Sequence, residues 1–240
     1  NYWTNIKHNN KSIWSVCPVM KGGVPSDNKA FFLSVRPSDF SNDTVFIHTI
    51  SNSYKAGNAT IETKVYKTDI KYGLAPDAIQ QDKQRLATND ARVLHAVETN
   101  GRIYYVQNSI NASTQRAGIF LGKIENIHTT PILKGQIISY DTLELGYPSI
   151  TSIGNSLNDH KCAIFVNFVK KNHYAGCMAL YKDHQDIVHA PLILKYGEGN
   201  VNRLTDTVER WGDYSGIQQL DWERNAVLTS GYYGKTNTQH

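Results

Sequence analysis

The fold class of this chain is decided by residues 92–108, RVLHAVETNGRIYYVQN. The central pair Asn100-Gly101 supplies the two positive-φ positions of a type I′ turn, which joins antiparallel strands. The segments on either side of it are rich in β-branched and aromatic residues, the composition of strands. With two further strands expected at 117–125 and 132–139, residues 90–139 form a four-stranded antiparallel unit. Such a unit is typical of a propeller blade.

The same pattern recurs along the chain. Its clear starts at Asp90, Tyr147 and Trp211 lie 147 − 90 = 57 and 211 − 147 = 64 residues apart, a loose period that blades with variable loops can have. The prediction is therefore an all-β protein, a β-propeller that is an incomplete ring or a fragment, since four blades are fewer than a closed ring usually contains. The expected blades are residues 13–72, 90–139, 147–198 and 211–240.

One stretch, residues 76–86 (PDAIQQDKQRL), has a helical composition. It is short and polar, and Pro76 with Asp77 favours a loop. We interpret it as a connection between blades that contains at most one helical turn.

Composition restricts the classes of function. The 240 residues are 40% hydrophobic and 19% charged, and the formal net charge is only +4, with scattered basic residues, which argues against a nucleic-acid partner. No apolar run reaches the ~18 residues of a membrane span. The sequence opens on Asn1 without an apolar leader, so we expect a processed protein or a piece of a longer one. Cys17, Cys162 and Cys177 form an odd set without C-x-x-C spacing, which leaves open both one disulfide with a spare thiol and buried thiols.

Several runs resemble the propeller region of large exported, cell-surface proteins of Bacteroidota, some of them loosely labelled sialidase-like. They are PDAIQ (76–80), LATNDARV (86–93), NGRIYYV (100–106), YPSI (147–150) and RWGDYSGIQ (210–218). The resemblance spans residues 13–234. It implies a six- or seven-bladed fold and a secreted or cell-surface location.

The resemblance does not extend to sialidase catalysis. Sialidases need three arginines for the substrate carboxylate, a Tyr nucleophile paired with a Glu, and an Asp acid/base. They also carry Ser-x-Asp-x-Gly-x-x-Trp turns and an Arg-Ile-Pro start, and neither motif occurs here. We therefore expect no sialidase active site.

The run from Arg210 to Gly216 has two interpretations. As a ligand corner, Trp211 or Tyr214 stacks on a sugar while Arg210 and Asp213 bond to it. As a structural turn, Gly212 takes a positive φ, Asp213 accepts backbone N–H groups and Trp211 packs between blades. We favour the structural turn.

Arg92 lies with Asp90 at the start of an expected inner strand. It either binds an anion or pairs with a carboxylate of a neighbouring blade, and we favour the ion pair. His95 on the same strand is expected to be a buried histidine and not a base.

Residues 183–189, DHQDIVH, contain two histidines and two carboxylates. Their spacing matches no helical zinc pattern, and a polar loop explains them as well. No cofactor is predicted, although Asp- and Asn-rich turns can hold a structural Ca²⁺.

The expected function is a non-catalytic, exported surface or adhesion module. Its partner would be a glycan or a protein at the cell surface, and the candidate ligand-binding residues are Arg92, Arg210, Trp211, Asp213 and Tyr214. Two alternatives are a sialidase-like glycoside hydrolase with an atypical site and a structural subunit of a surface assembly.

Overall fold

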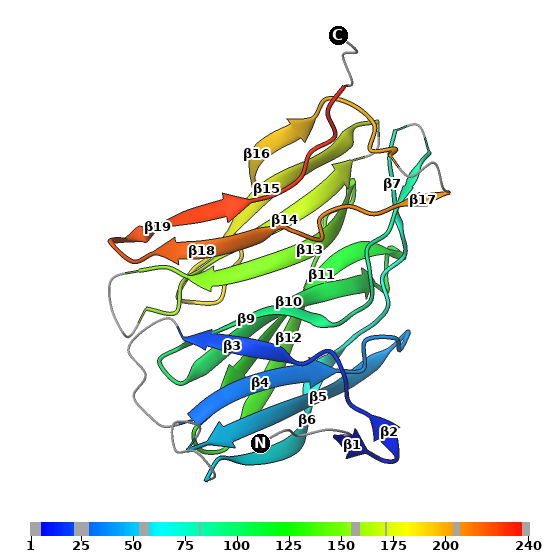
Figure 1. The fold of residues 1–240 in the computed structure, drawn as a ribbon. Coiled ribbons are helices and arrows are strands. Elements are labelled where there is room, and N and C mark those ends of the chain that lie inside the picture. The colour runs from blue at the N-terminus through cyan, green and yellow to red at the C-terminus, as the bar shows by residue number, and fades with distance from the viewer. Residues whose placement is uncertain are drawn as a thin grey trace.

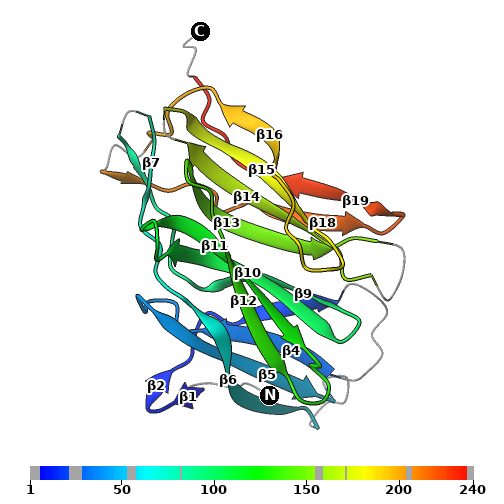
Figure 2. The same ribbon diagram turned by 180° about the vertical axis from the view of Figure 1, so that it is seen from behind.

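A computed structural model describes residues 6–21, 29–52, 58–81, 83–154, 159–170, 172–203 and 207–236. All regular structure in these residues is β, which confirms the prediction of an all-β fold (Figures 1 and 2). The described residues contain no helix with the length and apolar character needed to cross a lipid bilayer.

Most strands belong to four groups of consecutive antiparallel strands, which we call meanders (Figure 1). A hairpin of β1 (Lys7–His8) and β2 (Lys11–Ser12) precedes them. The first meander contains β3 (Cys17–Lys21), β4 (Lys29–Val35), β5 (Asn42–Ser51) and β6 (Thr60–Tyr72). The second contains β9 (Val93–Thr99), β10 (Arg102–Asn111), β11 (Arg116–Glu125) and β12 (Ile132–Ile138).

The third meander contains β13 (Leu143–Ser152), β14 (Cys162–Lys170), β15 (Tyr174–Lys182) and β16 (Leu192–Gly197). The fourth consists of only β18 (Gly216–Leu220) and β19 (Glu223–Ser230). The unit expected at 211–240 therefore contributes two strands, and its residues 237–240 lie outside the described part of the chain.

The first two meanders do not remain separate four-stranded blades. Val19 to Lys21 of β3 pair in parallel with Ala96 to Glu98 of β9, which joins both meanders into one eight-stranded sheet. This sheet is nearly barrel-shaped, because its outer strands β6 and β12 approach each other, and the Gly135 N–H donates to Asp69 Oδ1 at 2.7 Å. The expected separation into four-stranded blades therefore does not hold between the first and second meanders.

The second meander contributes to two cores, because neighbouring residues of a strand point to opposite faces of the sheet. Tyr105 of β10 packs into the apolar core shared with the first meander, whereas Tyr104 packs into the core shared with the third. A smaller core around Phe165 joins the third meander to β18 and β19. The second meander therefore buries both of its faces.

The hairpin between β9 and β10 has the predicted turn. Asn100 has φ 47° and Gly101 has φ 72°, as a type I′ turn requires. Arg102 pairs with Thr99 directly beside the turn.

Residues 76–81 and 83–86 form a connection without a helical turn, and the short strands in it were not expected. It forms β7 (Ala78–Ile79) and β8 (Arg85–Leu86), an antiparallel pair to which β17 (Val208–Glu209) adds in parallel. The backbone hydrogen bonds gained from a distant strand outweigh the weak helical tendency of so short a segment. This connection thus ties the middle of the chain to its C-terminal part.

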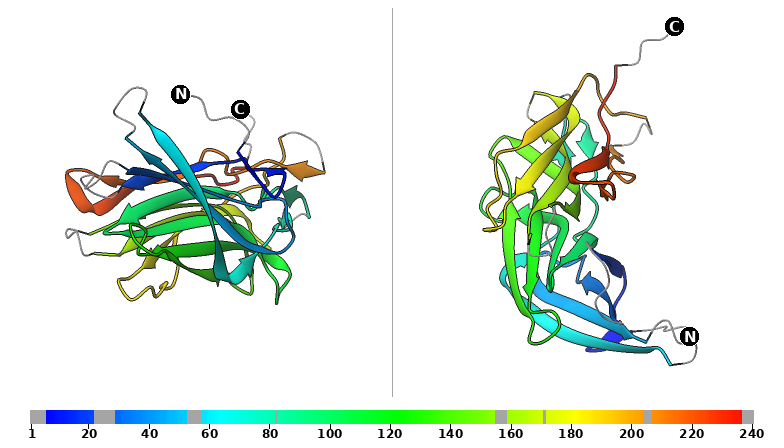
Figure 3. Two further views of the ribbon diagram at one scale, coloured as in Figure 1. Left: turned by 90° about the horizontal axis from the view of Figure 1, so that it is seen from below. Right: turned by 90° about the vertical axis from the view of Figure 1, so that its left-hand side faces the viewer.

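The first strands of the four meanders, β3, β9, β13 and β18, follow one another across the face seen in Figure 1. Seen from the side, the meanders form a curved stack (Figure 3, right). β3 and β9 are parallel, and the arrows of β3, β13 and β18 point to the same side in Figure 1, so these first strands begin at a common end of the stack. That end positions the candidate site.

Candidate functional site

The candidate site lies where the first strands of the meanders begin. Side chains that precede or interrupt these strands lie there, and we call this region the entry rim: Trp14, Asp90, Arg92, Tyr147, Arg210, Asp213 and Tyr214. Tyr147 lies near enough to Arg92, Arg210 and Asp213 to interact electrostatically with each of them. The rim brings together all the candidate ligand-binding residues of the sequence analysis except the buried Trp211.

Arg92 is held by the turn that leads into β9. Its Nε and one terminal nitrogen donate to the two oxygens of Asp90 at 2.6 and 2.7 Å, and Asp90 Oδ1 also accepts the Arg92 N–H at 3.1 Å. The hydrogen bond to Asp90 raises the pKa of Arg92. Trp14, which is 45% exposed, lies with its ring 5.4 Å from the guanidinium carbon. The ion pair is thus formed within one turn, not with a neighbouring blade.

Tyr147 lies at the centre of the rim, at a β-bulge of β13 between Gly146 and Ser149. Its φ of 54° is strained for an aromatic residue and is held by contacts on both sides. Asn108 Oδ1 accepts the Tyr147 N–H at 2.8 Å, and the phenol donates to the Ala87 carbonyl at 3.1 Å. Burial raises the pKa of Tyr147, so its phenol stays protonated.

The corner from Arg210 to Gly216 combines a structural and an exposed part. Trp211 is 2% exposed and lies edge-on to Tyr147, with ring centroids 6.2 Å apart. Gly212 has φ 76°, as the structural interpretation predicted. Asp213 accepts from Arg210 at 2.7 Å, while Ser215 Oγ closes the turn by donating to the Gly212 carbonyl. The described bonds of Asp213 are therefore to a side chain, not to turn amides.

Tyr214 is the most exposed aromatic residue of the rim, at 82%. Arg210 beside it is also exposed, and its hydrogen bond to Asp213 raises its pKa. The rim thus offers two aromatic side chains, Trp14 and Tyr214, each next to an arginine–carboxylate pair. Flat apolar rings beside fixed charged groups can stack on and bond to a polar ligand.

The sequence matches no protein-family model and no curated protein, and the fold matches no solved structure.

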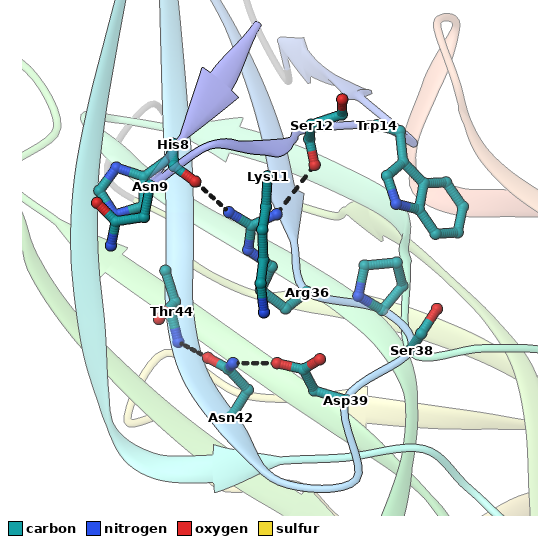
Figure 4. Close-up of a pocket in the computed structure, with 11 residues that line it drawn as sticks. His8, Asn9, Lys11, Ser12, Trp14, Arg36, Ser38, Asp39, Asn42 and Thr44 are labelled. Atoms are coloured by element: carbon teal, nitrogen blue, oxygen red, sulfur yellow. Dashed lines mark hydrogen bonds between the residues drawn. The ribbon is translucent and has the colours of Figure 1, made fainter.

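A cavity of about 460 Å³ adjoins the rim behind Trp14 (Figure 4). Its walls are the β1–β2 hairpin and the loop between β4 and β5, with Arg36, Asp39 and Asn42. The Pro37 carbonyl accepts the Ala91 N–H at 2.9 Å, which fixes this loop next to Arg92. No sequence motif marks this cavity, because its walls come from two separate segments of the chain.

The polar loop at 183–189 holds ion pairs. Asp183 accepts the N–H groups of Gln185 and Ile187 and bonds to His189. Asp186 points the other way, toward Lys123 and Lys182. Among the described residues, no three His, Cys, Asp or Glu side chains are grouped to hold a metal ion.

Asp186 joins the second and third meanders. It accepts from Tyr104 Oη, Lys123 Nζ and Lys182 Nζ at 2.9, 2.6 and 2.9 Å. Burial opposes ionisation of Asp186, but the hydrogen bonds from the two lysines outweigh it and lower its pKa. No sequence pattern singles out Lys182, although it is completely buried.

His95 is half-buried, and the three cysteines lie inside the protein. Partial burial lowers the pKa of His95, whose Nδ1 accepts the Ile150 N–H, so it is less enclosed than the interior histidine that the sequence predicted. Cys17, Cys162 and Cys177 are buried free thiols. Burial raises the pKa of both Cys17 and Cys162 to about 12.

Proposed function

We propose that this chain is a non-catalytic glycan-binding module that uses the entry rim, and that it is exported to the cell surface like the Bacteroidota proteins that it resembles. We further propose that its meanders are the blades of an incomplete propeller ring, or of a fragment of a six- or seven-bladed propeller.

Three features support the propeller architecture. The second and third meanders each have four antiparallel strands in sequence order. The second and third meanders pack face to face around an apolar core, as blades do. At the outer strand of the third meander, Leu192 and Leu194 of β16 remain 66% and 41% exposed. A further blade would cover such a face.

The observation that carries the glycan-binding proposal is the pairing of exposed rings with fixed charges at the rim. Tyr214 is exposed beside the Arg210–Asp213 pair, and Trp14 is half-exposed beside the Arg92–Asp90 pair. Aromatic rings bind the apolar faces of sugars, while carboxylates and guanidinium groups bond to hydroxyls. Both pairs are preorganised by their turns, which lowers the entropic cost of binding.

The same contacts favour binding over catalysis. Arg92 and Arg210 are each paired with a carboxylate, and Arg36 donates to the carbonyls of Ser12 and His8. A sialidase needs such arginines for its substrate carboxylate. It also needs an activated tyrosine, whereas the pKa of Tyr147 is raised.

A glycan array with purified protein tests this proposal. We expect binding to a subset of glycans, lost in Tyr214→Ala and retained in Trp222→Ala. The control is matched because Trp222 is also 82% exposed but lies at the opposite end of β18. Equal binding by parent and Tyr214→Ala would reject the rim as the site. Turnover of fluorogenic glycosides would support the hydrolase alternative, and absence of any glycan binding would support a structural subunit.

A further inference from the structure

The cavity beside the rim has an unusual distribution of charge. Its upper wall, in the view of Figure 4, carries Lys11 and Arg36, and its lower wall carries Asp39 with Asn42. Asp39 Oδ2 accepts from the Asn42 side chain, and Asn42 Oδ1 accepts the Thr44 N–H at 2.7 Å. Two cations thus face one carboxylate, which leaves an excess of positive charge.

Arg36 is a fixed part of this cavity. One terminal nitrogen donates to the Ser12 carbonyl at 2.9 Å and the other to the His8 carbonyl at 3.1 Å. The guanidinium carbon lies 4.8 Å from the centre of the Phe46 ring. Within the described part of the chain no carboxylate lies within ion-pair distance of Arg36. Its charge therefore acts on the cavity, while both terminal nitrogens are already engaged and cannot easily form a two-pronged carboxylate contact.

Lys11 is the adaptable donor. It is exposed, and it pairs with His8 in the β1–β2 hairpin directly above Arg36. Figure 4 shows its side chain extending toward the side where Asp39 and Asn42 lie. Among the described residues it has no ion-pair partner. An ammonium group is a compact charge with three donors, which suits an oxyanion of three or more oxygens.

We propose that this cavity binds a sulfate or phosphate ester group carried on a sugar, with Lys11 as the direct donor and Arg36 as the fixed counter-charge. The inference rests on the proposed glycan-binding function, because Trp14 lines the cavity and also lies against Arg92. A sugar stacked on Trp14 would place one substituent in the cavity. A tetrahedral oxyanion supplies enough oxygens for both cations, and its charge balances their excess.

Titration calorimetry with three forms of one oligosaccharide tests this proposal: sulfated, chemically desulfated and uronate-bearing. A sugar phosphate and inorganic sulfate and phosphate form further arms. We expect the sulfated form or the sugar phosphate to bind at least tenfold more tightly than the neutral form, and the stronger of the two identifies the source of the ester. Lys11→Gln should remove that tenfold difference, and Lys11→Glu should reverse it.

Lys64→Gln is the matched control, since Lys64 is an exposed lysine of β6 outside the cavity, and it should bind like the parent. Equal affinity for sulfated and neutral forms would overturn this inference and leave the proposed function intact. Tighter binding of the uronate than of both esters would also overturn it. Binding of the ester that depends on Lys11 but not on Tyr214 would support the cavity and exclude Tyr214 from the glycan site.

Discussion

The ammonium group of Lys182 lies 4.0 Å from the centre of the Tyr104 ring, across the contact between the second and third meanders. It also donates to Asp186 Oδ1 and to the Asp183 carbonyl, both at 2.9 Å. A completely buried lysine is stable only if its charge is compensated.

Asp186→Ala should therefore destabilise the protein strongly. It removes the counter-charge of a buried ammonium group, and breaking such a pair costs about 3–5 kcal/mol of unfolding free energy. Urea unfolding of the parent and the variant measures this loss of unfolding free energy. Glu198→Ala is the control, because Glu198 and its partner Lys195 are both about half-exposed (45% and 44%) and solvent screens such a pair. Similar losses in the two variants would contradict a structural role for Lys182 and Asp186.

Gly101→Val should lower the unfolding free energy by about 1–3 kcal/mol, because valine resists positive φ. A side chain at Gly101 meets only His128 at 3.6 Å, so backbone strain is the expected cause. Gly216→Val is the control, because it adds the same side chain at a position without backbone strain. A side chain there meets only Ser230 at 3.9 Å, and Gly216 is not among the residues with positive φ. If both variants melt at the parental temperature, positive φ is not required at Gly101.

Trp211→Ala should cost about 3–5 kcal/mol by leaving a cavity against Tyr147. Asp213→Ala should cost less than ~1 kcal/mol, because its partner Arg210 is 70% exposed. The sequence alone suggested a larger loss at Asp213, through unpaired turn amides. Thermal unfolding of both variants compares the two losses of stability. A large loss of stability in Asp213→Ala would indicate that Asp213 holds the backbone amides of the turn.

Stability should fall as the pH drops from about 7.5 to 5. Burial lowers the pKa of His48, whose ring nitrogens bond to Ser34 and Thr63 at 2.8 Å. Between that lowered pKa and the ~6.5 of an exposed histidine, the unfolded chain binds a proton that the folded protein does not, so acid favours unfolding. His48→Gln should flatten the dependence of the urea midpoint on pH, and an unchanged slope would contradict this.

The three cysteines should be unreactive toward Ellman's reagent in the folded protein. The thiolate is the reactive form, and burial raises the pKa of all three thiols. Unfolding in guanidinium chloride without reductant should expose three thiols. Recovery of only one would indicate a disulfide.

Local features of the fold were predictable from the sequence. The turn at Asn100-Gly101 and the positive φ of Gly212 follow from residue types that few other conformations accommodate. The parallel pairing of β3 with β9 was not predictable, because it joins Val19 to Ala96, which lie 96 − 19 = 77 residues apart. Neither strand has a sequence signal for that partner.

Only those parts of the candidate site that lie within one turn could be predicted from the sequence. Arg92 and Arg210 bond to carboxylates only two and three residues away, so the local turn places both partners of each ion pair. Lys11 and Arg36 share a cavity only because the β1–β2 hairpin folds over the end of β4. Lys182 was missed because a lysine in a polar sequence is normally exposed.

The strand β3 divides its hydrogen bonds between two neighbours: Cys17 and Pro18 pair with β4, and the next three residues pair with β9. During translation, the second half of β3 must wait until a further 77 residues have been added (96 − 19) before its partner exists. At ~5–20 residues per second this delay lasts about 4–15 s on the ribosome. An open strand edge can recruit wrong partners during that time, and Pro18 and Lys21 are residue types that discourage such pairing. The chain thus carries its own protection against aggregation while it is being made.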